Sequence, residues 1–209
     1  MSTNFETRIK DVVWKTYLML TISIICFLFS SLIEWNESII TLSLYTNIIL
    51  VFLIIIYKNV VYLISLSFCL GITISPVISV ITIINPNIIF LALVTTALIF
   101  IGLSIIGIYF NTTYDNIYLV SGIMYSCLST IIWLSILNYF FRLPFVEIII
   151  LYSSLVIFSI YTIMDTNNLL KTSNGNTVIH AMNLFLNFAN LFLDILTLII
   201  KLKTKNKND

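Results

Sequence analysis

Four polar side chains recur along the last apolar segment of this sequence at the spacing of a helix. Asn183, Asn187, Asn190 and Asp194 are four, three and four residues apart, so they lie on one face of a helix. An acidic residue, Asp165, stands near the end of the preceding apolar segment. An ionised carboxylate inside a bilayer costs about 2.5–3.5 kcal/mol, and such residues usually mark ion or proton pathways. The pattern predicts a polar site buried among helices, where a carboxyl could act as a proton switch.

Asp165 and the polar stripe face each other if the last two segments form an antiparallel hairpin. Asp165 lies six residues before Lys171, which is about 9 Å along a helix. Asn183 lies at a similar depth on the returning helix, and Asn187 lies about one turn deeper. We therefore expect Asp165 near Asn183 and Asn187, with Asp194 about two turns beyond. The alternative is that the asparagines only join helices through hydrogen bonds.

The composition requires a membrane environment for these residues. Of the 209 residues 60% are hydrophobic and only 9% are charged, whereas soluble domains carry about 25% charged residues. A net charge of +1, without a basic face, argues against nucleic-acid binding. The three cysteines lie in apolar runs without metal-ligand spacing. Neither a resident metal nor a cofactor is expected, and the lipid bilayer is the first partner.

Seven apolar segments are long enough to cross a bilayer as helices. They are residues 17–33, 39–57, 60–84, 88–110, 117–141, 146–170 and 178–202. Short links make successive helices antiparallel, so one all-α transmembrane domain over residues 1–209 is predicted, with a short cytosolic segment 1–13 and a basic tail 201–209. Gly71 and Pro76 in the third segment predict a bend that serves packing or acts as a hinge.

The basic residues place the N-terminus in the cytosol. Those on the N-terminal side are Arg8, Lys10, Lys15, Lys58 and Lys171. The tail contains four further lysines, and seven crossings would place it on the opposite side, giving five of the ten basic residues to each side. If the last segment does not cross, nine of the ten lie in the cytosol. The side of the C-terminus stays open at this point.

The same residues carry a resemblance to a known family. The sequence MDT at 164–166, followed by HAMNLFLNFANLFLDIL at 180–196, resembles the end of the sixth helix and the seventh helix of the Bax inhibitor-1 (transmembrane BAX inhibitor motif) proteins. Residues 71–100 and the sequence LSTIIWL at 128–134 also resemble family segments in order and spacing. The resemblance extends over the chain from about Trp14.

This resemblance implies six helices around a central seventh and a pH-sensitive Ca²⁺ leak of the endoplasmic reticulum membrane, or of bacterial membranes, together with suppression of stress-induced cell death. In the family, two Asp residues on the last two helices share protons and hold the pore closed. Asp165 matches the first, but Asn187 occupies the second position, so one titrating group is absent. A shifted or weakened pH response follows, for which Asp194 could compensate. Lys58 matches a basic position and could pair with a carboxylate, or it is only a cytosolic interfacial lysine.

Two functions are compatible with these residues. The first is a passive cation channel with Ca²⁺ as the permeant ion, transiently bound near Asp165, and proton gating around Asp165. The second is a non-conducting regulator that binds cell-death or stress-response membrane proteins. An enzyme is not expected, because no span contains a hydrolase or metalloprotease motif. A Lys205-x-Lys207-x-x ending resembles a signal for retrieval to the endoplasmic reticulum.

Overall fold

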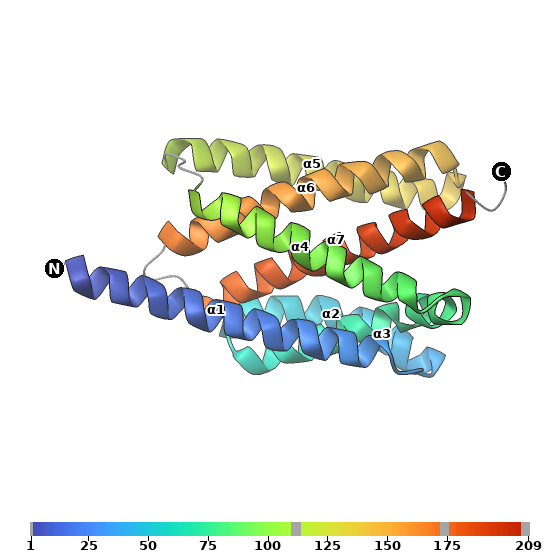
Figure 1. Cartoon of the computed structure of the whole chain (residues 1–209), viewed down its shortest axis with the longest axis horizontal. Coiled ribbons are helices and arrows are strands. Elements are labelled where there is room, and N and C mark those ends of the chain that lie inside the picture. The colour runs from blue at the N-terminus through green and yellow to red at the C-terminus, as the bar shows by residue number, and fades with distance from the viewer. Residues whose placement is uncertain (1, 110–113, 172–175, 206–209) are drawn as a thin grey trace. The chain divides into compact units, whose positions relative to one another are not determined.

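The computed structural model describes residues 2–109, 114–171 and 176–205, and it consists of seven α-helices in this range (Figure 1). Their bounds are α1 Ser2–Ser31, α2 Glu37–Tyr57, α3 Val60–Ile84, α4 Asn87–Tyr109, α5 Tyr114–Phe141, α6 Pro144–Lys171 and α7 Thr177–Lys205. Isoleucine and valine dominate these segments although both favour strands in water. In lipid every backbone N–H and C=O must bond within its own segment, so the runs become helices. The predicted all-α membrane fold is confirmed.

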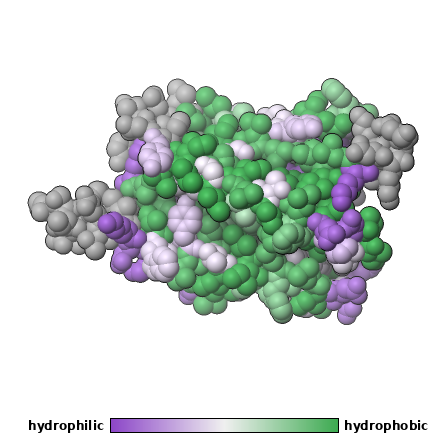
Figure 2. All heavy atoms as spheres, viewed as in Figure 1, coloured by the Kyte–Doolittle hydropathy of each residue, from purple (hydrophilic) through white to green (hydrophobic). Residues whose placement is uncertain are grey.

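All seven helices are long and apolar enough to cross a membrane. Many large apolar side chains point outward, as lipid-facing residues do, among them Phe52, Leu98 and Trp133. Figure 2 shows hydrophobic side chains over most of the face in view, with hydrophilic side chains near helix ends. The protein is a multi-pass integral membrane protein. The share of buried residues is highest in the span of α7, at 50%, and lowest in that of α5, at 6%.

The seven helices coincide with the seven predicted segments, with bounds that differ by a few residues at most ends and by more at the N-terminus. Helix α1 begins at Ser2, and the apolar span within it begins at Lys10, whereas the span was expected from Tyr17. The polar residues before Trp14 continue the helix, because nothing in that stretch stops it: it contains neither Pro nor Gly. At the other end α7 continues to Lys205, and residues 206–209 of the basic tail, with most of the Lys-x-Lys-x-x motif, lie outside the described residues.

Three links contain only two residues, and in two of them a basic residue takes up a left-handed conformation. Lys58 ends α2 with φ 51° and donates its backbone N–H to the Ile54 carbonyl over 2.8 Å. The next residue, Asn59, caps α3 by accepting from the Val61 N–H at 2.9 Å. Arg142 has φ 50° after α5 and donates its backbone N–H to the Asn138 carbonyl at 2.8 Å. Each link therefore reverses the chain within two residues.

The chain divides into two compact units, and α4, α6 and α7 each contribute to both. Unit 1 comprises residues 1–91 and 168–186, and unit 2 comprises residues 92–167 and 187–209. In unit 1, α3 packs against both α1 and α2 (Figure 1). In unit 2, rings join neighbouring helices: Phe100 of α4 lies 5.6 Å from Phe188 of α7, and Tyr125 of α5 lies 6.2 Å from Tyr161 of α6.

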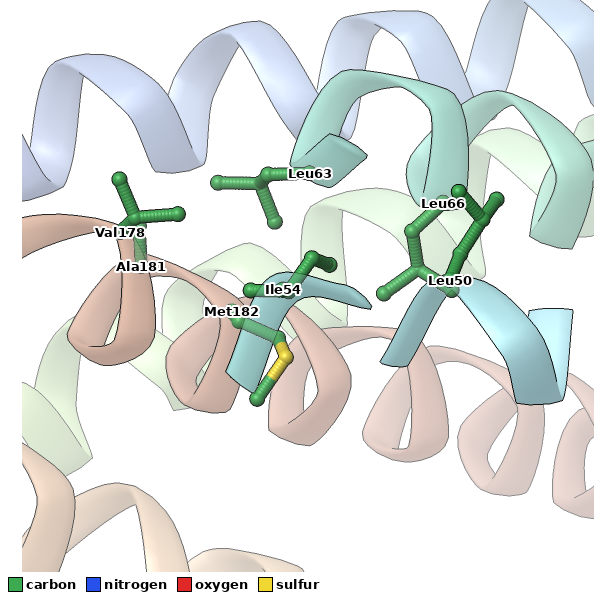
Figure 3. Packing of buried hydrophobic residues seen from close by; sticks show 7 residues of the cluster. All are labelled: Leu50, Ile54, Leu63, Leu66, Val178, Ala181 and Met182. Carbon is green, nitrogen blue, oxygen red and sulfur yellow. The ribbon is translucent and has the colours of Figure 1, made fainter. Parts of the chain in front are cut away.

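The core of unit 1 is completed by the first turns of α7. The cluster consists of Leu50, Ile54, Leu63, Leu66, Val178, Ala181 and Met182 (Figure 3). Residues from α2 and α3 meet residues from α7 there, and Ile54, Leu63 and Ala181 are fully buried. Phe27 of α1 also meets Phe185 of α7 edge to face at 5.8 Å. The apolar face of α7 opposite its polar stripe is thus used for packing.

The middle of α3 contains two residues that allow close packing. A methyl group at Gly71 would overlap the Ser30 hydroxyl and the Phe27 carbonyl oxygen of α1, so α1 and α3 are in contact there with no room for a side chain. Five residues later Pro76 lies inside the continuous helix and cannot donate to the Ile72 carbonyl. The Ser75 hydroxyl donates to that carbonyl at 2.8 Å instead. These contacts support packing as the role of Gly71 and Pro76.

We expect Ser75→Ala to lower the free energy of unfolding by about 1 kcal/mol, because the Ile72 carbonyl then loses its donor in a buried position. Thermal unfolding of the purified protein in detergent measures the change. Ser135→Ala is the matched control, since Ser135 is exposed and its hydroxyl bonds the carbonyl of Ile131 within a regular helix. Equal midpoints for both variants would contradict the role of Ser75.

Candidate functional site

The centre of the candidate site is a hydrogen bond between a carboxylate and an amide on the last two helices. Asn187 Nδ2 of α7 donates to Asp165 Oδ2 of α6 over 2.7 Å. Asn187 is only 5% exposed, and Asp165 is half-buried. The distance is at the short end of the ordinary range for an N–H···O hydrogen bond. The predicted meeting of Asp165 with Asn187 is confirmed.

Two residues near Asp165 in the sequence of α6 have buried hydroxyl groups. Tyr161 lies one turn before it and Thr166 directly follows it. Both hydroxyls are buried without a hydrogen-bond partner among the described residues. Buried polar atoms of this kind often bind water. Tyr161, one turn before Asp165, shares its side of α6, whereas Thr166 lies on the side that packs against Gly107.

A close contact between α4 and α6 fixes the backbone beside Asp165. A Cβ on Gly107 of α4 would lie 2.7 Å from the Ile163 carbonyl oxygen and 2.8 Å from Thr166 Cβ. The Asn167 amide donates to the Gly107 carbonyl at 3.1 Å across the same contact. Neither Gly107 nor Asn167 was identified from sequence; the available signal was a glycine within an apolar span, which often marks close helix packing.

Asp194 forms a second polar contact in unit 2. The hydroxyl of Ser154 on α6 donates to Asp194 Oδ2 over 2.5 Å, so this residue of the predicted stripe also faces α6. Ser154 was not identified from sequence, because a serine in an apolar helix usually bonds its own backbone. The remaining asparagines, Asn183 and Asn190, are half-buried, and Asn183 belongs to unit 1. The expected proximity of Asn183 to Asp165 stays a prediction.

An ion pair follows at the end of the two helices. Lys201 Nζ of α7 lies 2.9 Å from Glu147 Oε1 of α6, with both side chains partly exposed. Lys58, by contrast, is exposed at the end of α2 and pairs with no carboxylate within the described part of the chain. Among residues 2–109, 114–171 and 176–205, no three His, Cys, Asp or Glu side chains gather at a metal-binding distance.

Fold and site together define an all-α, multi-pass membrane protein with an acid–amide pair inside its spans. Residues 9–205 match the family model Bax1-I, described as inhibitor of apoptosis-promoting Bax1. The chain belongs to this Bax inhibitor family, and the resemblance seen in the sequence is confirmed.

Individual relatives are similar over about seven tenths of the chain, and two of them are named Bax inhibitor 1 or probable Bax inhibitor 1. The chain is 31% identical over 156 residues to Bax inhibitor 1 of Drosophila melanogaster, covering 73% of this chain and 63% of the relative. It is 33% identical over 144 residues to an uncharacterized protein of Campylobacter jejuni, covering 68% and 61%. A probable Bax inhibitor 1 of Paralichthys olivaceus is 28% identical over 153 residues, covering 72% and 63%. The matches thus span about six tenths of the length of these relatives.

Proposed function

We propose that this protein is a passive cation leak channel, with Ca²⁺ as the permeant ion, whose gate includes Asp165. The observation that carries the proposal is the hydrogen bond between Asp165 and Asn187 inside the spans of α6 and α7. An intramembrane carboxylate is retained against a large desolvation cost mainly where it serves ion or proton movement. The endoplasmic reticulum is the proposed membrane, where such a leak would modulate stress-induced cell death.

The pair also suggests how the gate closes. While Asn187 donates to Asp165, α6 and α7 are joined at this depth and the carboxylate is occupied. A cation or proton that binds Asp165 competes with the amide, and the buried Tyr161 hydroxyl, one turn earlier on the same helix, provides a further oxygen ligand. One carboxyl rather than two makes the pH response weaker than that of a pair sharing a proton.

We expect Asp165→Asn to reduce Ca²⁺ efflux from loaded liposomes at least about tenfold, because the only charged ligand of the pair is removed. Efflux is followed with a Ca²⁺ dye, with protein-free liposomes as background. Asp11→Asn is the matched control: the Asp11 side chain is 69% exposed beside Lys15 near the start of α1, so its efflux should equal that of wild type. Equal efflux from wild type and Asp165→Asn would exclude Asp165 from the gate.

The second candidate is a non-conducting regulator that binds cell-death or stress-response proteins. It is favoured by the names in the comparisons, which refer to inhibition of apoptosis-promoting Bax and not to transport. Here the hydrogen bond between Asp165 and Asn187 would only hold helices together. Wild-type protein that is folded in liposomes but does not raise efflux above background at any pH would favour this function.

A further inference from the structure

The contacts between α6 and α7 in unit 2 form a regular series. On α7 the contacting residues are Asn187, Asp194 and Lys201, each seven residues after the last. Their partners on α6 are Asp165, Ser154 and Glu147, separated by eleven and seven residues. Steps of seven and eleven both return a helix almost to the same angular position. All three contacts therefore lie on one seam between these helices.

Each contact contributes a carboxylate, and the carboxylates come from both helices. Asp165 and Glu147 lie on α6, and Asp194 lies on α7 between the other two contacts. Seven residues of helix correspond to about 10 Å, so the contacts on α7 are spaced about 10 Å apart. Oxygen ligands at such intervals provide successive binding positions for a cation that crosses the membrane.

The middle contact differs from its neighbours in how its charge is balanced. Lys201 is bound to Glu147 at 2.9 Å, whereas Asp194 forms no ion pair within the described residues. Its partner is the neutral Ser154 hydroxyl, which donates to Asp194 Oδ2 at 2.5 Å. A half-buried carboxyl group with only a neutral partner can take up a proton or a cation to balance its charge.

We propose that Asp194 and Ser154 form a second cation site, in series with Asp165, and that the ion pair of Glu147 with Lys201 closes the seam at its end. This inference rests on the proposed channel function. The carboxylate and hydroxyl oxygens are ligands suited to Ca²⁺. With one carboxylate the site binds weakly, as a site that must also release its ion should. Lys201 neutralises Glu147, so an ion leaving Asp194 has to displace or pass that pair.

The test compares Asp194→Asn and Ser154→Ala with a matched control, Ser159→Ala. Ser159 lies on the same helix as Ser154, but its hydroxyl bonds its own backbone at Leu155. Ca²⁺ efflux from loaded liposomes and calorimetric titration of the purified proteins with Ca²⁺ are measured together. We expect Asp194→Asn to lower efflux and weaken Ca²⁺ binding by about tenfold, and Ser154→Ala to act several-fold in the same direction. Ser159→Ala should match wild type.

The two readouts separate this inference from the channel proposal. If the wild type conducts, and Asp194→Asn and Ser154→Ala both leave efflux and Ca²⁺ binding unchanged, the second site is overturned and the channel stays intact. Absence of wild-type efflux defeats the channel, and the titration then decides whether Asp194 binds Ca²⁺. If Asp194→Asn does not fold, Ser154→Ala alone decides, because it keeps the carboxylate and removes only a hydroxyl.

Discussion

Gly71→Ala is expected to destabilise unit 1 by about 3 kcal/mol, the upper end of the usual cost of overfilling a packed core. The added methyl would overlap both the Ser30 hydroxyl and the Phe27 carbonyl oxygen. A hydroxyl can rotate away, but the carbonyl belongs to the backbone of α1, so α1 and α3 must separate. The gain of about 1 kcal/mol in helix propensity from Gly to Ala does not offset this cost. Thermal unfolding in detergent measures the difference.

Gly102→Ala provides the control for this substitution. Gly102 is also a helical glycine in an apolar span, but a Cβ there would meet no atom within 4 Å. Its unfolding temperature should equal or slightly exceed that of wild type, because only the propensity gain remains. If the two variants unfold at the same temperature, α1 and α3 are not in the close contact described at Gly71.

Asn187→Asp is expected to give Ca²⁺ efflux a steep dependence on pH that the wild type lacks. The substitution places two carboxyls at the position where an amide nitrogen and a carboxylate oxygen are now 2.7 Å apart. Carboxyls this close share one proton, and losing it leaves like charges that repel. At acidic pH the shared proton would hold α6 to α7, and at alkaline pH repulsion would part them. Efflux should therefore rise with pH, by on the order of a hundredfold.

Efflux from liposomes, measured at several pH values for wild type and variant, tests this expectation. Asn183→Asp is the comparison variant, because it adds a carboxyl four residues earlier on α7, at a half-buried position of unit 1. The pH dependence should be specific to the second carboxyl at position 187 and absent from this variant. Identical pH profiles for wild type and Asn187→Asp would contradict proton sharing at this site.

The sequence was sufficient to place Asp165 against Asn187, because two facts determined it. The spacing of four, three and four on α7 put Asn187 and Asp194 on one face, and a short link forced α6 and α7 to be antiparallel. The apolar composition predicted a membrane protein, and in lipid each segment has to be a helix so that its backbone N–H and C=O groups are paired. Spans, hairpin and the inner contact could all be inferred from one-dimensional patterns.

Contacts that depend on which helices approach each other could not be inferred. Ser154 is one of several hydroxyls on α6, and Ser159 resembles it in sequence but bonds its own backbone. The role of Gly107 depends on α4 crossing α6, which no local pattern specifies. Helix α1 also extends back to Ser2, because hydrophobicity marks where a span is apolar and not where a helix begins.

Helix α7 belongs to both units, and this has a consequence for biosynthesis. Chains emerge from the ribosome N-terminus first, so α1, α2 and α3 are made well before Val178, Ala181 and Met182, which complete their core. During translation the faces of Leu50, Ile54, Leu63 and Leu66 that α7 will cover must be occupied by lipid or by an insertion factor. Unit 1 can therefore reach its final packing only after the seventh helix has entered the membrane.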